Sequence, residues 1–297
     1  MNCDEFIESI KKEEIDYDLL INENISLIHD KNEFFDINFI ITVRGRIDFA
    51  KPMHDSFIQA AKKSGLKICY TIVEHSINPE HSKFCKKNKI NYIWIKSPEK
   101  GMFNKCLAYN CGVFYGPKAK FVLLHDIDCL IQSDFFNLLM QNHENKEFRA
   151  IQCFVDRRVM YCDYSVTNEL ISGNIKVDDL HEDHYGVTPP YCLGAPGGSI
   201  MVERDLFFQV GGYEEGFFQG NSPEDSFFWE KVDTISKMWT SDFPRINIYH
   251  MHHPVTYYDN PKINEMTQVL NDFKSMSKDD KIRYINAKSE LIRKYEK

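Results

Sequence analysis

The sequence predicts an α/β protein whose central sheet is mostly parallel and covered by helices on both faces. Through the first 130 residues, short runs rich in β-branched residues alternate with helical patterns, which is typical of parallel strands joined by helices. In addition, Arg44-Gly45-Arg46 and Asp126-Ile127-Asp128 each directly follow an expected strand. Because ligands of such sheets bind beyond the carboxyl ends of the strands, we expect these two sets of charged residues to meet in one cleft.

The strands expected in the first half are short apolar runs that end at turns. They cover residues 37–43, 67–73, 90–95 and 120–125. The helices between them have apolar residues at helical spacing, and the first and last of them end at glycine: 48–64, 79–88 and 102–115. Residues 1–35 are expected to form a polar, helical N-terminal extension.

The second half is less regular. Strands are expected at 149–155, 197–202 and 245–250, and helices at 203–210, 223–236 and within 262–297. Residues 156–192 are rich in Asp, Tyr, His and Pro without clear periodicity and are expected to form a long loop. The expected organisation is an extension over 1–35, a nucleotide-binding half over 36–130, an acceptor half over 131–260 and a helical tail over 261–297.

Composition narrows the class of protein. The chain has 297 residues, a hydrophobic content of 43% and a net charge of −8. That charge disfavours nucleic acid as a partner, because proteins that bind its backbone carry a basic surplus. The start has no signal-peptide pattern and no apolar run is long enough to span a membrane, so a cytoplasmic protein is expected. The nine cysteines form no CxxC pair and are expected to be buried free thiols.

Two groups of residues have the chemistry of a metal site. Asp126 and Asp128 offer hard oxygen ligands directly after a buried strand, which suits Mg²⁺ or Mn²⁺. His250, His252 and His253 directly follow another expected strand, and Mn²⁺ accepts imidazole beside carboxylate more readily than Mg²⁺ does. The spacing alone does not decide which histidine binds, and an acidic turn and a surface histidine cluster are the alternatives.

Other charged residues suit phosphate binding or proton transfer. Arg44 and Arg46 could grip a diphosphate, or could be solvated loop charges. Glu224 and Asp225 open a helix, where a carboxylate can take a proton from a hydroxyl; by spacing alone, capping of the helix is the better interpretation. At the start of another helix, Phe103-Asn104-Lys105 could contact a nucleoside and a phosphate, although alone this is a weak signal.

Taken together and in order, these motifs resemble a known arrangement. Phe103-Asn104-Lys105 with the following helix and 121–128 resembles the nucleotide-sugar half of the β-1,4-galactosyltransferase family. The segments 196–202, 207–213 and 224–228 resemble its C-terminal galactosyltransferase module. That module also occurs in polypeptide N-acetylgalactosaminyltransferases and in bacterial chondroitin-type polymerases, and the resemblance covers roughly residues 37–260.

The resemblance implies a GT-A catalytic domain over 36–260 that binds Mn²⁺ (or Mg²⁺) and a UDP-sugar, with 36–130 as its nucleotide-binding half and 131–260 as its acceptor and catalytic half. It places Asp126 near the ribose or the metal and Asp128 on the metal. For the histidine that binds the metal, the resemblance favours His250 first and His253 second. The resemblance also implies that Arg44 and Arg46 form a basic loop that binds the diphosphate. The backbone at Gly197 and Gly198 would approach the sugar or the acceptor closely. Glu224 would bind a sugar hydroxyl, and Asp225 would be the general base.

The implied activity is an inverting, metal-dependent transfer of a hexose or N-acetylhexosamine from a UDP-sugar to a hydroxyl of a glycan or glycoconjugate. The family's Trp-Gly-Gly is replaced here by Asn221-Ser222-Pro223, and a third acid is replaced by Ser226, so the acceptor and the donor sugar stay open. The alternatives are a retaining transfer, a sugar-nucleotide nucleotidyltransferase and a non-catalytic carbohydrate-binding protein. For the basic tail, contact with a membrane is the alternative to a solvated helix.

Overall fold

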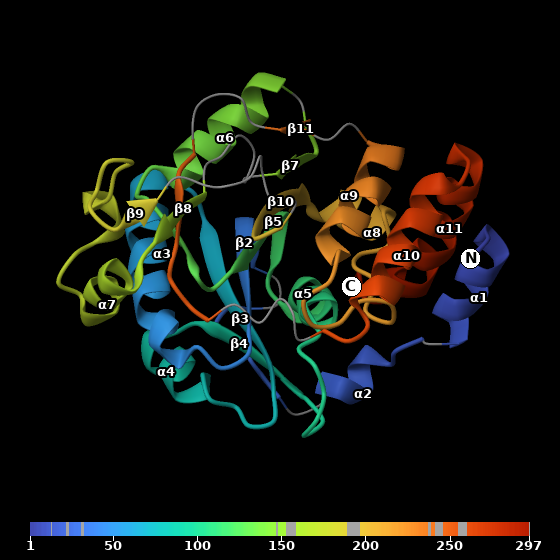
Figure 1. The fold of residues 1–297 in the computed structure, drawn as a ribbon, viewed down its shortest axis with the longest axis horizontal. Coiled ribbons are helices and arrows are strands. Elements are labelled where there is room, and N and C mark those ends of the chain that lie inside the picture. The colour runs from blue at the N-terminus through green and yellow to red at the C-terminus, as the bar shows by residue number, and fades with distance from the viewer. Residues whose placement is uncertain are drawn as a thin grey trace.

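The structure is a computed structural model that describes residues 1–12, 14–21, 24–30, 33–146, 148–152, 159–188, 197–236, 239–240, 246–254 and 260–296. Within these residues, eight strands form one large sheet and four form a second, smaller sheet (Figure 1). No helix in this part of the chain is both long and apolar enough to cross a membrane.

The parallel strands lie at the centre of the large sheet. Its spatial order is β1 (Ile25–Ser26), β4 (Asn91–Lys96), β3 (Ile68–Ser76), β2 (Phe34–Val43), β5 (Lys118–Asp126), β10 (Ser199–Glu203), β7 (Ala150–Gln152) and β11 (Trp239–Thr240). Strands β4, β3, β2 and β5 pair in parallel, whereas β1 and β10 run antiparallel to their neighbours. The predicted α/β class with a mostly parallel sheet is therefore confirmed.

Helices cover both faces of this sheet. In chain order they are α1 (Cys3–Lys12), α2 (Tyr17–Ile21), α3 (Ala50–Ser64), α4 (Ser82–Asn88), α5 (Lys105–Tyr115), α6 (Phe135–Lys146), α7 (Tyr164–Ser172), α8 (Arg204–Gln209), α9 (Glu224–Ile235), α10 (Ile263–Ser275) and α11 (Lys278–Arg293). In Figure 1, α3 and α6 lie on one side of the sheet, and α5, α9, α10 and α11 lie on the other.

Strand β2 shows how the sheet separates two cores. Phe39 packs against Phe57 of α3 and Phe136 of α6, whereas Ile40 points to the opposite face. There it meets Gly112 of α5, where a Cβ atom would lie 2.6 Å from the Ile40 side chain. Because both faces of the strand are buried, apolar residues occupy both of its faces rather than alternate positions only.

The smaller sheet was not expected from the sequence. Its order is β6 (Cys129–Ile131), β12 (Ile248–His250), β8 (Val159–Cys162) and β9 (Val187–Thr188). Strand β6 follows Asp126-Ile127-Asp128 directly, and β12 pairs with it so that His250 lies opposite Cys129. This sheet therefore joins the acidic turn to the histidine segment.

The expected long loop over 156–192 is wrong in its described part, which contains β8, α7 and β9. Helix α7 has a regular start and end: the Asp163 side chain accepts a hydrogen bond from Val166 N–H, and Gly173 closes the helix with a φ of 76°. Val166 and Leu170, four residues apart, are both buried in the core. The helix has only nine residues, so the helical spacing of its few apolar residues is hard to recognise among the polar residues around it.

Two other expectations lie partly outside the described residues. The strand expected at 149–155 is present as β7, and 153–155 are not among the described residues. Likewise the strand expected at 245–250 is present as β12, and residue 245 is not described. The helices expected at 203–210 and 223–236 are α8 and α9.

The C-terminal segment is helical, as expected, and its two helices, α10 and α11, pack against the rest of the protein. Phe273 of α10 and Tyr284 of α11 are fully buried against α1 and α9. Lys288 of α11 is also buried, and its ammonium group lies 2.8 Å from Glu215 and 3.6 Å from Glu214. One of the basic residues of this segment therefore belongs to the interior.

Removing this buried charge should destabilise the protein. We expect Lys288→Met to cost about 3–5 kcal/mol of unfolding free energy, because it leaves two buried carboxylates without one of their counter-charges. Urea unfolding measures this. The control is Lys278→Met, at an exposed lysine on the same helix, which should change stability by less than about 0.5 kcal/mol. Equal losses of unfolding free energy for the two substitutions would contradict the role of Lys288 as a buried counter-charge.

Candidate functional site

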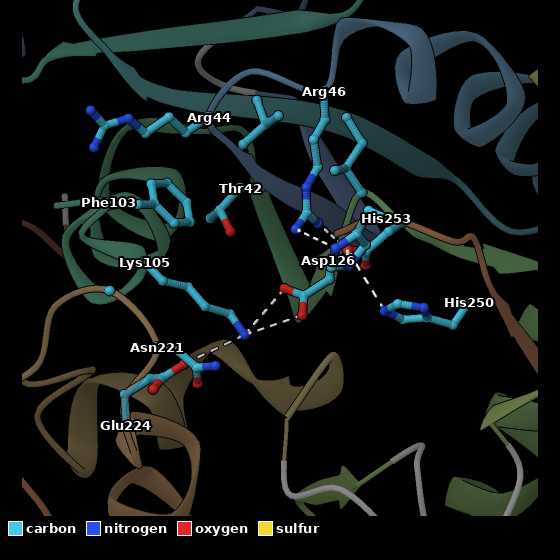
Figure 2. A pocket seen from close by; sticks show the side chains of 14 residues that line it. Thr42, Arg44, Arg46, Phe103, Lys105, Asp126, Asn221, Glu224, His250 and His253 are labelled. Atoms are coloured by element: carbon cyan, nitrogen blue, oxygen red, sulfur yellow. Dashed lines mark hydrogen bonds and ion pairs between the residues drawn. The ribbon is translucent and has the colours of Figure 1, made fainter. Parts of the chain in front are cut away.

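A cavity of about 730 Å³ lies beyond the carboxyl ends of β2 and β5. Figure 2 shows side chains around it from the loop after β2, from α5, from the end of β5, and from β12 and the segment after it; the Arg44 side chain points away from the others. The residues that line it are Thr42, Val43, Arg44, Arg46, Phe103, Lys105, Asp126, Ile127, Asp128, Gly220, Asn221, Glu224, His250 and His253. The basic loop and the acidic turn thus share one cleft.

The acidic turn is held at this edge by both sheets. Thr42 of β2 is the register partner of Asp126, and Asp126 N–H donates to the Gly198 carbonyl at 2.9 Å. Ile127 is buried in the core between the two aspartates. On the other side, Met251 N–H donates to the Asp128 carbonyl at 2.8 Å. The turn is therefore fixed by backbone hydrogen bonds before any ligand binds.

Two of the three histidines face Asp128. His253 Nε2 lies 3.1 Å and His250 Nε2 lies 3.8 Å from Asp128 Oδ2. His252 lies elsewhere. Its backbone N–H donates to the Thr167 hydroxyl, and its ring packs edge-on against Tyr164 of α7. The structure thus brings His250 and His253 to the acidic turn and leaves His252 beside α7.

Asp128 is almost fully buried, with 4% of its surface exposed. The Arg46 guanidinium forms an ion pair with its carboxylate and also lies 3.4 Å from His253 Nδ1. Burial alone would raise the pKa of Asp128. The His253 hydrogen bond and the charges of His250 and Arg46 outweigh burial and hold that pKa well below its usual range. Asp128 is therefore a permanent anion in this cleft.

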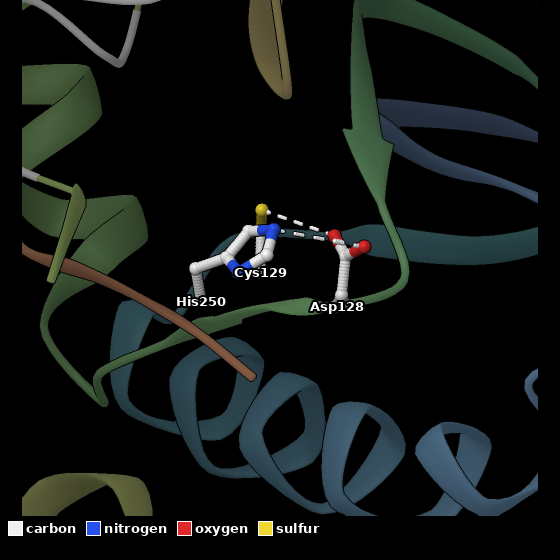
Figure 3. Close-up of side chains that lie close together, drawn as sticks. All are labelled: Asp128, Cys129 and His250. Carbon is white, nitrogen blue, oxygen red and sulfur yellow. Dashed lines mark hydrogen bonds and ion pairs between the residues drawn. The ribbon is translucent and has the colours of Figure 1, made fainter. Parts of the chain in front are cut away.

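Cys129 is the third potential ligand atom beside Asp128 and His250 (Figure 3). Its thiol donates a hydrogen bond to Asp128 Oδ1 at 3.3 Å. Burial, together with the neighbouring Asp128 charge, raises the pKa of this thiol well above its usual value. Cys129 therefore stays a protonated donor to Asp128 rather than a thiolate. Like the other cysteines in the described part of the chain, it is buried and free.

Lys105 joins three carboxyl groups at the floor of the cavity. Its ammonium nitrogen lies 3.1 Å from Asp126, 3.2 Å from Asp225 and 3.7 Å from Glu224. Burial and the adjacent Asp225 raise the pKa of Glu224 to about 8, against the lowering effect of Lys105. Glu224 is therefore largely protonated at neutral pH and can donate a hydrogen bond.

Asp225 is held by groups from three segments. Tyr213 donates its hydroxyl hydrogen to Asp225 Oδ1 at 2.9 Å, while Lys105 contacts Oδ2. Gly197 lies against the same carboxylate, because a Cβ atom there would lie 1.8 Å from Asp225 Oδ2. Any other residue at position 197 would displace Asp225 or the strand that follows.

Asp225, Gly197 and Gly198 line a second cavity of about 490 Å³ that adjoins the first. Asn104 lines neither cavity: its side chain caps α5 by accepting from Leu107 N–H and donates to the Glu215 carbonyl. The structure thus places Asn104 in a capping position and the two glycines beside Asp225.

Two tyrosines of the site were not predicted. Tyr109 donates to Asp126 Oδ1 at 3.1 Å, and Tyr213 donates to Asp225. Tyr109 lies four residues after Lys105 in a helix, so its place on the same helix face could have been inferred from spacing. Tyr213 offers no comparable local signal, because its contact depends on the packing of α9.

The fold and the cleft together define the chain as a protein of the GT-A glycosyltransferase fold, as the sequence motifs predicted. Among solved structures, the mannosyltransferase PcManGT from Pyrobaculum calidifontis, in complex with GDP-Man and Mn²⁺, is 11% identical. The match covers 97% of this chain and 78% of that one with a TM-score of 0.54.

Two further structures agree on the fold. S. aureus TarS 1-349 is 10% identical, with a TM-score of 0.53 over 85% of this chain and 70% of that one. GalNAc-T7 with UDP, GalNAc and Mn²⁺ is 12% identical, with a TM-score of 0.51 over 80% of this chain and 48% of that one. Comparison of the sequence with protein-family models and with curated proteins gives no match.

Proposed function

We propose that the chain is a metal-dependent glycosyltransferase that moves a hexose or N-acetylhexosamine from a UDP-sugar to an acceptor hydroxyl with inversion. The observation that supports it best is the arrangement of charges in the cleft. An anionic carboxylate, Asp128, faces two imidazoles on one side, and a second carboxylate, Asp225, lies in the adjoining cavity. Two solved structures of similar fold contain Mn²⁺ and a nucleotide, GDP-Man in PcManGT and UDP in GalNAc-T7, which supports a role for a metal and a nucleotide.

The residues around Asp128 fit a divalent ion. Two ligands that each lie about 2.1 Å from one ion and at right angles are about 3 Å apart. The 3.1 Å between Asp128 and His253 Nε2 is of this size, and His250 Nε2 lies somewhat farther away, at 3.8 Å. A carboxylate beside imidazole is a donor set that Mn²⁺ accepts. Asp128 together with His250 or His253 would therefore hold the metal, with Asp126 next to it.

The chain's own groups would bind and orient the donor. Arg44 and Arg46 supply guanidinium groups for the diphosphate, and Phe103 supplies an apolar wall for the nucleoside. Mn²⁺, when bound, neutralises negative charge that develops on the departing diphosphate. Glu224, largely protonated at neutral pH, would hold a hydroxyl of the transferred sugar.

The transfer itself would be a single displacement. The acceptor oxygen forms a bond to the anomeric carbon while the bond from that carbon to the diphosphate oxygen breaks, so UDP leaves. Asp225 accepts the proton of the attacking hydroxyl. Tyr213 and Lys105 hold the two oxygens of this carboxylate in place, and Gly197 leaves room beside it.

The experiment that tests this function is the hydrolysis of a panel of nucleotide sugars with and without Mn²⁺. We expect release of UDP from at least one UDP-sugar, dependent on the metal. GDP-sugars form the comparison set, because PcManGT is solved with GDP-Man. Release of pyrophosphate from UTP and a sugar phosphate would instead indicate a nucleotidyltransferase. The coupling constant of the product's anomeric proton, read by NMR, would distinguish inversion from retention.

Arg46 adds a prediction about metal binding. Its guanidinium neutralises Asp128 in the ligand-free protein, so a metal ion must displace it. We expect Arg46→Met to bind Mn²⁺ about tenfold more tightly without nucleotide, and to bind UDP more weakly in the presence of Mn²⁺. Titration calorimetry measures both affinities.

The matched control is Arg44→Met. Arg44 lines the same cavity but donates to the Gly101 carbonyl at 2.5 Å rather than to Asp128. Its replacement should leave the affinity for Mn²⁺ alone unchanged. Unchanged Mn²⁺ affinity in both variants would show that Arg46 does not compete with the metal.

A further inference from the structure

The second cavity adjoins the first. Its volume of about 490 Å³ is within the usual range of small-ligand pockets. The two cavities share five lining residues: Lys105, Asp126, Asn221, Glu224 and His250. A molecule in the second cavity would therefore lie next to one bound in the first, and Asp225 lines the second only.

The walls of this cavity combine apolar and hydroxyl-binding groups. Val159 and Tyr161 of β8 line it together with Ile263 and Thr267 of α10. The Tyr161 ring lies 5.2 Å from the His250 ring, centroid to centroid, at the boundary of the two cavities. An aromatic ring beside polar groups suits a sugar ring, which has an apolar C–H face and a rim of hydroxyls. Helix α10, which lies outside the predicted catalytic domain, contributes to this wall.

The charges of the cavity are mostly negative. Three of the described lining residues have carboxyl groups: the carboxylates Asp126 and Asp225, and Glu224, which is largely protonated at neutral pH. The basic side chains among the described lining residues are Lys105, which already contacts all three, and the His250 imidazole. Among the described lining residues, an acidic ligand would thus meet two carboxylates and an ammonium group that is already paired with both, which is unfavourable in a partly buried site.

We propose that the second cavity binds the acceptor as an uncharged saccharide, with Tyr161 against its ring and α10 as the wall that limits its extent. This inference rests on the proposed function, because it places the attacking hydroxyl of that saccharide beside Asp225. Uronic acids, sialylated or sulfated glycans, and phosphorylated acceptors are disfavoured by the carboxylates of Asp126 and Asp225.

Matched acceptor probes test the charge of the acceptor. Methyl glycosides of glucose, galactose, mannose and their N-acetylated forms are each compared with the corresponding uronic acid or sulfate, using the UDP-sugar that the protein hydrolyses. We expect transfer to at least one neutral glycoside, with kcat/KM at least about tenfold above that of its acidic counterpart. Equal or better use of the acidic form overturns the proposal, as does UDP-sugar hydrolysis without transfer to any glycoside.

A substitution in α10 tests the location. Thr267→Trp places a large side chain in the cavity, and we expect it to raise the acceptor KM about tenfold while the affinity for UDP and Mn²⁺ stays unchanged. The control is Gln268→Trp, since Gln268 is the next residue of the same helix, is exposed and does not line the cavity. Equal acceptor KM values for the two variants overturn the assignment of this cavity.

Different results would overturn the proposed function and the acceptor proposal. If the protein neither binds UDP with Mn²⁺ nor hydrolyses any UDP-sugar, the proposed function is wrong. If UDP binds and the donor is hydrolysed, but acidic acceptors are preferred or Thr267→Trp has no effect, only the acceptor proposal is wrong.

Discussion

Asp128→Ala is expected to lower the rate of sugar transfer about 10³-fold or more. The substitution removes the anion around which His250, His253 and Arg46 are arranged. Without it, the proposed metal has no carboxylate ligand at this position, and the leaving diphosphate loses the counter-charge that the metal would supply. Rates of UDP release with the best UDP-sugar measure the effect.

Two variants separate this effect from a folding defect. Asp128→Asn keeps the shape of the side chain and removes its charge, so it should lose nearly as much activity while its thermal unfolding resembles that of the parent protein. Asp183→Ala, at an exposed aspartate outside the cavities, should keep full activity. Activity of Asp128→Asn within a few-fold of the parent would show that the charge has no role in transfer.

Asp225→Asn is expected to keep UDP and Mn²⁺ binding and to lower turnover by about 10²–10⁴-fold, which is the usual contribution of a general base. The amide has the shape of the carboxylate and can still accept the Tyr213 hydrogen bond, but it cannot take up the acceptor proton. UDP affinity by calorimetry and kcat with the accepted sugar are the two quantities to compare.

The control for this prediction lies on the same helix. Asp233 is an exposed aspartate of α9 that lines neither cavity, and Asp233→Asn should leave both UDP affinity and kcat unchanged. Normal turnover by Asp225→Asn would remove Asp225 from the mechanism. A loss of UDP binding would mean instead that its charge is needed to position Lys105.

Much of the first half of the chain could be predicted because its signals are local. Strands β2, β3, β4 and β5 are rich in apolar residues, Arg44-Gly45-Arg46 directly follows β2, and Asp126-Ile127-Asp128 lies at the end of β5. The rule that parallel strands end at one edge of a sheet then brings Arg46 and Asp128 together, and the structure places them in an ion pair.

The smaller sheet could not be predicted in this way. Strands β6 and β12 have three residues each, and their pairing joins segments more than 100 positions apart. This pairing brings His250 close to Asp128. Because the pairing depends on tertiary packing, the sequence predicted the contact only through the resemblance of its motifs to a known family. The Lys105 cluster is likewise tertiary: α5, β5 and α9 must pack before one ammonium can face three carboxyl groups.

The most direct test is to locate Mn²⁺ by its anomalous scattering in crystals grown with Mn²⁺ and UDP. We predict one ion bound to the Asp128 carboxylate and to an imidazole nitrogen of His250 or His253, with a phosphate oxygen of UDP also in contact. An ion bound to UDP but well away from Asp128 and both imidazoles would contradict the proposed metal site and the mechanism built on it.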